Sequence, residues 1–331
     1  MMAAQDKNTE APFVMTLDLG GTNSVFGIVG RTGTIQAKAS LKTNDHEDAE
    51  DFVRSSAALL RQMADSIGCR QAAKALGIGA PDANHYRGTM EMAHNVKWGH
   101  DRIIPLAAMF EEALHIPAVL INDADAAALG EMRCGAARGM KDFILLTLGT
   151  GVGSGIVIDG KLVHGSDGFA GELGHVVMRR EHGRPCACGR KGCLEAYCSA
   201  AGVVRTAREM LAESRRPSLL RESDTRPITP EDVAFAAQKG DELAKDVYRY
   251  TGQILGEACA EFAAFCSPEA FIFFGGLTGA WDLLLPAMRE SYEKNVFHLY
   301  RGKARFLLSE LRGGEAALLG AAAQAWEIAG A

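Results

Sequence analysis

The sequence contains one pattern twice: an apolar strand, a turn of Gly and Thr, and a second strand. The first copy runs through Asp18-Leu-Gly-Gly-Thr22 and the second through Leu148-Gly-Thr-Gly151. A strand follows each turn, whereas a helix follows the loop of a dinucleotide-binding motif. A repeated supersecondary unit predicts two related domains, and polar turns at buried strand ends predict that the domains face a shared cleft.

Length and composition agree with a two-domain globular protein. The chain has 331 residues, more than one hydrophobic core usually serves. A content of 47% hydrophobic and 23% charged residues is typical of soluble proteins, and the net charge of −6 argues against a nucleic-acid-binding surface. Neither a signal peptide nor an apolar span of membrane length is evident. Eight cysteines in so long a chain are not a disulfide scaffold, so we expect reduced thiols and a cytoplasmic protein.

Hydrophobic periodicity predicts the elements around the two turns. We expect strands over Phe13–Gly20, Val25–Gly30, Thr34–Ser40, Ala75–Pro81, Ala118–Asp123, Phe143–Leu148, Ser154–Asp159, Lys161–His164, His175–Met178 and Ala270–Phe274. We expect helices over Asp48–Ile67, from Thr229-Pro230 onward, over Leu243–Phe265 and over Glu315–Ile328. These elements predict a small N-terminal α/β domain over residues 1–122 and a large α/β domain over residues 123–314. A C-terminal helix over about residues 315–331 is expected to pack back onto the small domain.

The two Gly/Thr turns are candidate phosphate-binding loops. Small residues let backbone N–H groups approach an anion, and neither turn has the Gly-Lys-Ser/Thr of a Walker A loop. Asp18 ends its strand where it could orient a Mg²⁺-bound water, and Gly275-Gly276 ends another strand where it could contact a base or ribose. The alternative is that each turn is a plain hairpin. The expected nucleotide contacts are Asp18, Gly20, Gly21, Thr22, Asn23, Thr150, Gly151, Gly275 and Gly276.

A dense group of metal-binding residue types lies between Gly171 and Glu195. It contains one His and three Cys, with a Glu just before and a Glu just after them. Thiolates and imidazoles suit a four-coordinate Zn²⁺, and carboxylates accept hydrogen bonds from hydroxyls. The segment therefore predicts a metal-braced pocket for a polyhydroxy ligand; the alternative is a metal staple that contacts no ligand. We expect the remaining histidines to lie outside any metal site.

Polar residues also follow the expected strand Ala118–Asp123. Asp123 and Asp125 begin an Ala-rich segment of helical character. Either aspartate could cap that helix, and either could lie over the cleft as a functional carboxylate. The residues alone leave both roles open.

Together these motifs resemble the ROK family, which unites bacterial sugar kinases and sugar-responsive repressors. The matching segments are Asp18-Leu-Gly-Gly-Thr22, Asn122-Asp-Ala-Asp-Ala-Ala127, Leu148-Gly-Thr-Gly-Val-Gly153, Gly171-Glu-Leu-Gly-His175 and Cys186-x-Cys-Gly-x-x-Gly-Cys193-x-Glu195. The resemblance implies an α/β protein with the actin-like ATPase (ribonuclease H-like) fold, in which two α/β domains surround a cleft that binds ATP. It also implies a homodimer that uses ATP and Mg²⁺ to phosphorylate a hexose, most simply glucose to glucose 6-phosphate.

Site roles follow from the same resemblance. Asp123 corresponds to the catalytic base, and an ordinary carboxyl pKa near 3.9 would keep it ionised. The implied sugar contacts are Asn95, Asn122, Asp123, Glu172, His175 and Glu195. The implied ligands of a closed, structural Zn²⁺ are His175, Cys186, Cys188 and Cys193. Trp98 could stack on a sugar, but loop packing is the favoured reading.

Three alternatives remain open at this level. A kinase of N-acetylmannosamine, N-acetylglucosamine, fructose or allose would share these motifs. A sugar-sensing repressor would need a DNA-binding domain before the kinase-like part, and only 17 residues precede Asp18. A zinc-ribbon nucleic-acid module conflicts with the acidic charge. The expected partners are thus a hexose and ATP, with neither nucleic acid nor membrane.

Overall fold

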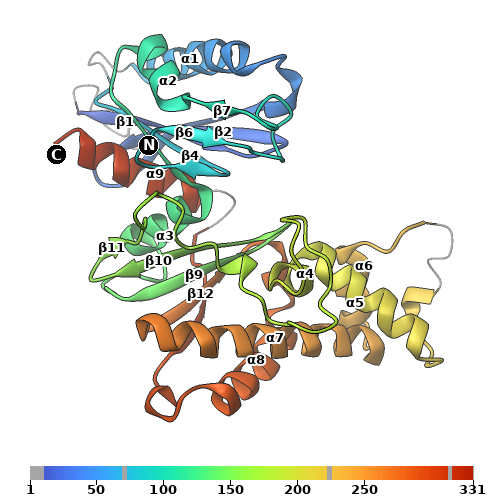
Figure 1. Cartoon of the computed structure of the whole chain (residues 1–331). Coiled ribbons are helices and arrows are strands. Elements are labelled where there is room, and N and C mark those ends of the chain that lie inside the picture. The colour runs from blue at the N-terminus through green and yellow to red at the C-terminus, as the bar shows by residue number, and fades with distance from the viewer. Residues whose placement is uncertain (1–10, 69–72, 222–225, 312–314, 331) are drawn as a thin grey trace, which may run out of the picture. The chain divides into compact units, whose positions relative to one another are not determined.

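The computed structural model describes residues 11–68, 73–221, 226–311 and 315–330, which form two compact units (Figure 1). The first unit comprises residues 1–139, 162–170 and 310–331, and the second comprises residues 140–161 and 171–309. The boundary expected between residues 122 and 123 falls inside the first unit. The helix that starts at Asp123 packs on strands of the first unit, which is why the unit continues beyond this point.

The first unit is built on a five-stranded sheet with the order β3-β2-β1-β4-β8. Its strands are β1 (Phe13–Leu19), β2 (Asn23–Gly30), β3 (Ile35–Lys42), β4 (Leu76–Ala80) and β8 (Ala118–Asn122). The first three form consecutive antiparallel pairs, whereas β4 and β8 run parallel to β1. A small second sheet contains β5 (Ala83–Asn84), β6 (Thr89–Glu91) and β7 (Ile103–Ile104).

Helices cover both faces of the five-stranded sheet (Figure 1). Helices α1 (Ala49–Ser66) and α2 (Leu106–Leu114) cover one face, and α3 (Asp123–Cys134) and α9 (Glu315–Ile328) cover the other. Each face is sealed by an apolar core, with Phe26, Phe52 and Phe110 fully buried on the α1 side. Helix α9 contacts β1, β2, β4 and β8, so the segment that follows the second unit in sequence completes the first unit.

Two glycines allow α3 and α9 to pack unusually closely. A Cβ atom on Gly320 would lie 1.6 Å from the Ala126 carbonyl oxygen, and one on Gly130 would lie 2.1 Å from the Ala316 carbonyl oxygen. No side chain larger than hydrogen fits at such a contact without moving a backbone. This crossing therefore fixes the first residue of α3, Asp123, relative to the sheet.

The second unit repeats the strand order of the first, as β11-β10-β9-β12-β13. Its strands are β9 (Phe143–Leu148), β10 (Val152–Ile158), β11 (Lys161–Leu162), β12 (Ala270–Phe274) and β13 (Arg305–Leu308). Strand β10 is antiparallel to β9, while β12 and β13 continue the sheet in parallel. The strand, turn and strand repeated in the sequence thus begins a sheet of the same strand order in each unit, which agrees with two related domains.

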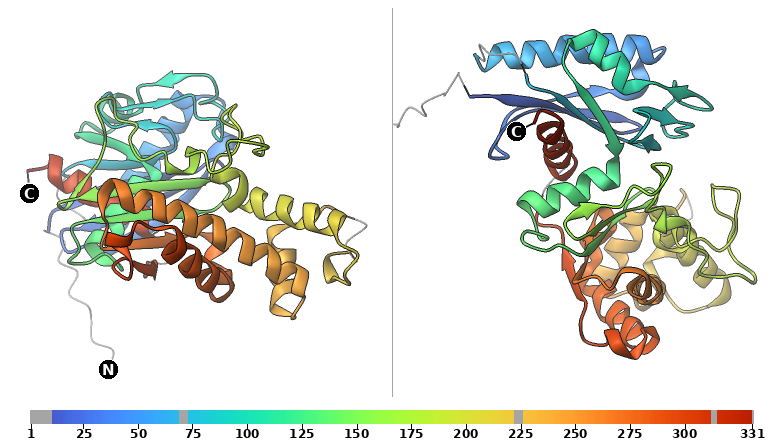
Figure 2. Two further views of the ribbon diagram at one scale, coloured as in Figure 1. Left: turned by 60° about the horizontal axis from the view of Figure 1, so that its bottom comes forward. Right: turned by 60° about the vertical axis from the view of Figure 1, so that its left-hand side comes forward.

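Helices of the second unit enclose its largest core. They are α4 (Glu195–Cys198), α5 (Ala200–Glu213), α6 (Pro230–Gln238), α7 (Glu242–Cys266) and α8 (Trp281–Asn295). Figure 2 shows α7 and α8 side by side. Short 3-10 helices are η1 (Thr43–Asp45), η2 (Leu173–His175), η3 (Leu219–Arg221), η4 (Gly276–Ala280) and η5 (His298–Tyr300).

Local capping explains where several helices begin. Asp48 accepts a hydrogen bond from the backbone N–H of Asp51 and starts α1. Thr229 and Asp232 form a reciprocal capping box around Pro230, the first residue of α6. Both starts agree with the sequence predictions.

One predicted strand is wrong. Residues 175–178 form no strand; η2 ends at His175, and Val177 makes only an isolated bridge with Cys193. The apolar run Val176-Val177-Met178 reflects packing of Val176 and Met178 against the core of the second unit rather than a sheet. The cysteines among the described residues are free thiols, and Cys69 lies outside those residues. No helix in the described ranges is long and apolar enough to cross a bilayer.

Candidate active site

One group of candidate site residues lies at the carboxyl ends of parallel strands in the first unit. Asp18 of β1 pairs with Gly79 of β4, and Gly79 pairs with Ile121 of β8, two residues before Asp123. A Cβ atom on Gly79 would lie 3.9 Å from the Asp123 Cα and 3.2 Å from the Ala126 side chain, so a glycine leaves room for α3 here. Ligands of open α/β sheets bind at such strand ends. Asp18 and Asp123 could be predicted from the sequence, whereas Gly79 was not predicted.

Helix α3 begins at this edge and orients Asp123. The Asn122 side chain is the N-cap, since its Oδ1 accepts the Ala124 backbone N–H at 2.9 Å. The Asp123 Oδ1 accepts the same N–H at 2.8 Å. Capping thus belongs to the Asn122–Asp123 pair, whereas Asp125 is buried beside His164, with its Oδ2 3.9 Å from the His164 Nδ1.

The two carboxyl groups have raised pKa values. Burial raises the pKa of Asp18 to about 7, and the negative charge of Asp123 adds to this rise while Lys38 opposes it. Burial of its carboxyl group raises the pKa of Asp123 too, although part of the residue is exposed. The backbone N–H groups of Ala124 and Asp123 oppose this rise. The ordinary pKa expected for Asp123 is therefore wrong. A raised pKa makes a carboxylate a stronger base, and the paired charges favour a cation nearby.

The first Gly/Thr turn and Asn95 lie together beside this edge. The Gly20 N–H donates to the Asn23 carbonyl at 3.2 Å, and the Thr43 hydroxyl donates to the Gly20 carbonyl at 2.6 Å. A Cβ atom on Gly21 would lie 2.4 Å from the Asn95 carbonyl oxygen, which explains the glycine. Thr22 and Asn23 are exposed at the tip of the turn.

Trp98 packs in the first-unit core rather than at a sugar site. It is 4% exposed and donates its indole N–H to the Thr43 carbonyl at 3.1 Å. Its ring centroid lies 5.0 Å from that of Phe52. The favoured packing role is confirmed.

The second Gly/Thr turn occupies the matching place in the second unit. Gly149 N–H donates to the Gly151 carbonyl at 3.0 Å, which closes the turn, and Thr150 is exposed. Gly275 has φ +109°, and a Cβ atom there would lie 2.5 Å from the Leu148 carbonyl oxygen. The structure therefore brings Thr150, Gly151 and Gly275 together at the ends of the parallel strands β9 and β12.

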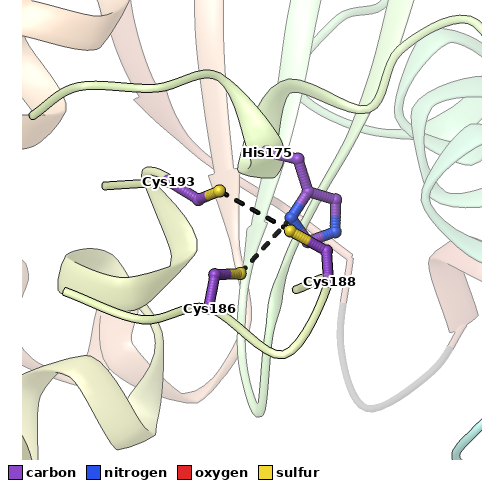
Figure 3. Close-up of side chains that lie close together, drawn as sticks. All are labelled: His175, Cys186, Cys188 and Cys193. Atoms are coloured by element: carbon purple, nitrogen blue, oxygen red, sulfur yellow. Dashed lines mark hydrogen bonds between the residues drawn. The ribbon is translucent and has the colours of Figure 1, made fainter. Parts of the chain in front are cut away.

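All four predicted metal ligands converge (Figure 3). His175, Cys186, Cys188 and Cys193 place one donor atom each within 4.8 Å of one another. The Cys186 Sγ lies 3.6 Å from the His175 Nδ1, and the Sγ atoms of Cys188 and Cys193 are 3.7 Å apart. A tetrahedral zinc with usual bond lengths separates two sulfurs by about 3.8 Å and a sulfur from a nitrogen by about 3.6 Å. The donor set thus fits Zn²⁺ in chemistry and in spacing.

The glutamates that flank the cluster differ in their surroundings. Glu172 is exposed. Glu195 is half-buried, and its Oε2 accepts the backbone N–H of Val152 at 3.0 Å while its Oε1 lies 3.6 Å from the Cys186 Sγ. His175 presents Nδ1 to the cluster, so its Nε2 points away from it (Figure 3).

A second group of donor atoms includes two of the other histidines. His94, His100 and Asp101 also bring one donor atom each within 4.8 Å of one another. All three residues are exposed, and the His100 Nδ1 already bonds the Asp101 carboxylate at 2.9 Å. The His94 and His100 rings lie 4.9 Å apart between centroids, and Asp101 has a left-handed backbone (φ +55°).

Comparisons with known proteins agree with these motifs. The model of the ROK family matches residues 14–327. A glucokinase of Halalkalibacterium halodurans is 34% identical over 307 residues, 92% of each chain. An N-acetylmannosamine kinase of Escherichia fergusonii is 29% identical over 93% of this chain and 96% of its own. The solved structure of a ROK family glucokinase from Streptomyces griseus, in complex with glucose and AMPPNP, is 34% identical. It covers 95% of this chain and 99% of its own, with a TM-score of 0.77.

Proposed function

The chain belongs to the ROK family, and we propose that it transfers the γ-phosphoryl group of ATP to a hexose, converting glucose to glucose 6-phosphate. The observation that carries this proposal is the pair Asp18 and Asp123 at the carboxyl ends of parallel strands, beside a Gly/Thr turn. Phosphoryl transfer needs a positioned nucleophile and charge neutralisation more than covalent help. The carboxylate pair can position the nucleophile, and the backbone N–H groups of the turn can neutralise phosphate charge.

In the proposed reaction Asp123 is the base. Its carboxylate accepts the proton of the sugar 6-hydroxyl as the hydroxyl oxygen attacks the γ-phosphorus. The bond from that phosphorus to the bridging oxygen breaks, and ADP leaves with the electron pair. The raised pKa of Asp123 suits this role, because a base whose pKa lies closer to the working pH takes the proton more readily. General-base catalysis is worth about 10²–10⁴ in rate.

The remaining binding roles are assigned by the same proposal. Asn95, Asn122, Glu172, His175 and Glu195 bond sugar hydroxyls. The nucleotide phosphates are held by the two Gly/Thr turns, and its base or ribose lies against Gly275-Gly276. A Mg²⁺ ion bound with ATP supplies neutralisation of phosphate charge. Asp18 would orient water bound to that ion.

We also propose that His175, Cys186, Cys188 and Cys193 hold a structural Zn²⁺. Four protein ligands fill a tetrahedral site and leave no position for substrate, so the metal supplies shape rather than chemistry. It fixes the His175 ring, whose Nε2 is left to donate to a sugar hydroxyl.

A substrate panel tests the proposed function. Initial rates with ATP and Mg²⁺ are measured for glucose, N-acetylmannosamine, N-acetylglucosamine, fructose and allose. We expect glucose to give the highest kcat/KM. A higher value for an acetamido sugar would move the assignment to an amino-sugar kinase, and no turnover with any sugar would remove the kinase assignment.

Light scattering tests the homodimer implied by the family: a mass near that of one 35.3 kDa chain would contradict it.

A further inference from the structure

The Glu195 carboxylate contacts both the cysteine cluster and the second Gly/Thr turn. Its Oε2 accepts the Val152 backbone N–H at 3.0 Å, and its Oε1 lies 3.6 Å from the Cys186 Sγ. A Cβ atom on Gly151 would lie 2.5 Å from the Oε2, so the glycine lets the carboxylate reach the turn. One side chain therefore joins the candidate metal site to the candidate phosphate loop, 43 residues apart in sequence.

A second bond holds the same turn. The Ala200 backbone N–H, at the start of α5, donates to the Gly149 carbonyl at 2.9 Å. Glu195 is the first residue of α4, so α4 and the first residue of α5 hold the turn at both of its ends. The turn is short, and a shift of this helical segment would move its backbone N–H groups.

The other metal-binding segment packs on the same strand from its own side. A Cβ atom on Gly174 would lie 2.0 Å from the Val152 carbonyl oxygen, and the Leu173 N–H donates to the Ser154 Oγ at 3.1 Å. Val152 is thus held at its N–H by Glu195 and closely approached at its carbonyl by the residue before His175. His175 and the three cysteines come from separate segments, both of which contact the start of β10. A metal that joins them cross-links the two supports of the turn.

We propose that Glu195 is a positioning residue for the phosphate loop, through which metal binding and nucleotide binding are coupled. Loss of the metal or of the Glu195 carboxylate releases the turn formed by residues 148–152 and weakens its grip on the nucleotide. This inference rests on the proposed function, which assigns that turn to the phosphates. It adds a task for Glu195 besides contact with sugar hydroxyls, since its Oε2 is already used by the Val152 N–H.

Two measurements that need no turnover test the coupling. The first is the affinity for AMPPNP with Mg²⁺ and without sugar, by calorimetry. The second is hydrogen exchange of the Val152 amide. Both are made on zinc-loaded wild type, on wild type after chelation, on Glu195→Ala and on Glu195→Gln. Glu213→Ala, an exposed residue at the end of α5, is the control. Metal content of every sample is measured.

We expect Glu195→Ala and the chelated protein to lose about tenfold or more in AMPPNP affinity, the size of a lost hydrogen bond to a charged group. The Val152 amide should exchange faster in both by a similar factor. Glu195→Gln keeps an acceptor for the Val152 N–H and should restore most of the protection, and Glu213→Ala should match wild type.

Unchanged AMPPNP affinity and unchanged Val152 exchange in Glu195→Ala would overturn the proposal, even if glucose affinity falls. If Glu195→Ala does not fold, the chelated wild type still decides the question: unchanged AMPPNP affinity and unchanged Val152 exchange after chelation would overturn the coupling. Should wild type itself fail to bind AMPPNP, the proposed function is wrong, while the Val152 exchange still shows whether Glu195 holds the turn.

Discussion

Replacing Asp18 by Asn should change how the stability of the first unit depends on pH. Burial and the charge of Asp123 raise the pKa of Asp18 from 3.8 to about 7 in the folded protein. Between these two values the folded chain keeps a proton on Asp18 that the unfolded chain has released. Stability of the wild type therefore falls as pH rises through this window and is constant above it, as far as Asp18 is concerned. Asn carries no titrating proton and lacks this loss.

The magnitude follows from the width of the window. One pH unit corresponds to about 1.36 kcal/mol, so a window of about three units costs the wild type at most about 4 kcal/mol by pH 8. Asp18 is only half-buried, and solvent screening makes this an upper limit. Between pH 5 and pH 8 the Asn variant should gain about 1–3 kcal/mol on the wild type.

Urea unfolding at several pH values, without Mg²⁺, measures this difference. Trp98 and Trp326 are buried in the first unit, so tryptophan fluorescence largely follows its unfolding. Comparing variant with wild type at each pH cancels the titrating groups that do not interact with Asp18. A stability difference that stays the same from pH 5 to pH 8 would refute the raised pKa and the pairing with Asp123.

The remaining predictions concern catalysis, metal and packing. Asp123→Asn should lower kcat by about 10²–10⁴ while glucose affinity, measured by calorimetry, stays near wild type; wild-type turnover would remove Asp123 as the base. Cys186→Ser should lose zinc by elemental analysis and lower Tm by about 2–4 °C for each kcal/mol of stability lost, and a variant with one zinc per chain would contradict the ligand assignment. Gly320→Ala places a methyl group against the Ala126 carbonyl and should cost about 1–3 kcal/mol in urea unfolding. Gly279→Ala, where a Cβ atom meets nothing within 4 Å, is the matched control and should be near neutral.

The parts of the fold that depend on local sequence rules could be predicted from the sequence. The strands β1, β2 and β9 and the start of α1 follow from apolar runs, turn glycines and a capping Asp48. The two- and three-residue strands β5, β6 and β7 carry too few residues for any pattern, and they were missed. The strand expected over residues 175–178 failed because its backbone bonds belong to the cysteine loop, with Leu194 N–H donating to the Val176 carbonyl at 2.9 Å.

In the candidate site, too, features set by local sequence could be predicted, and features set by tertiary contacts could not. The donors of the metal cluster are close in sequence, so their residue types and spacing were enough to predict that they converge. The raised pKa values of Asp18 and Asp123 depend on burial and, for Asp18, on the charge of Asp123 more than a hundred residues away, which no local pattern encodes. The bond from Val152 to Glu195 likewise depends on how α4 meets the sheet, so a residue expected only to bind sugar was found to hold a loop as well.

Helix α9 has a consequence for biosynthesis. It covers one face of the first sheet, yet it follows the entire second unit in sequence, so a ribosome must make that unit before the first sheet can be closed. During translation Val14, Val29 and Ala75 of the first sheet stay without their α9 partners Leu319 and Trp326. The nascent N-terminal half is then the portion in need of chaperone protection, although its strands emerge first.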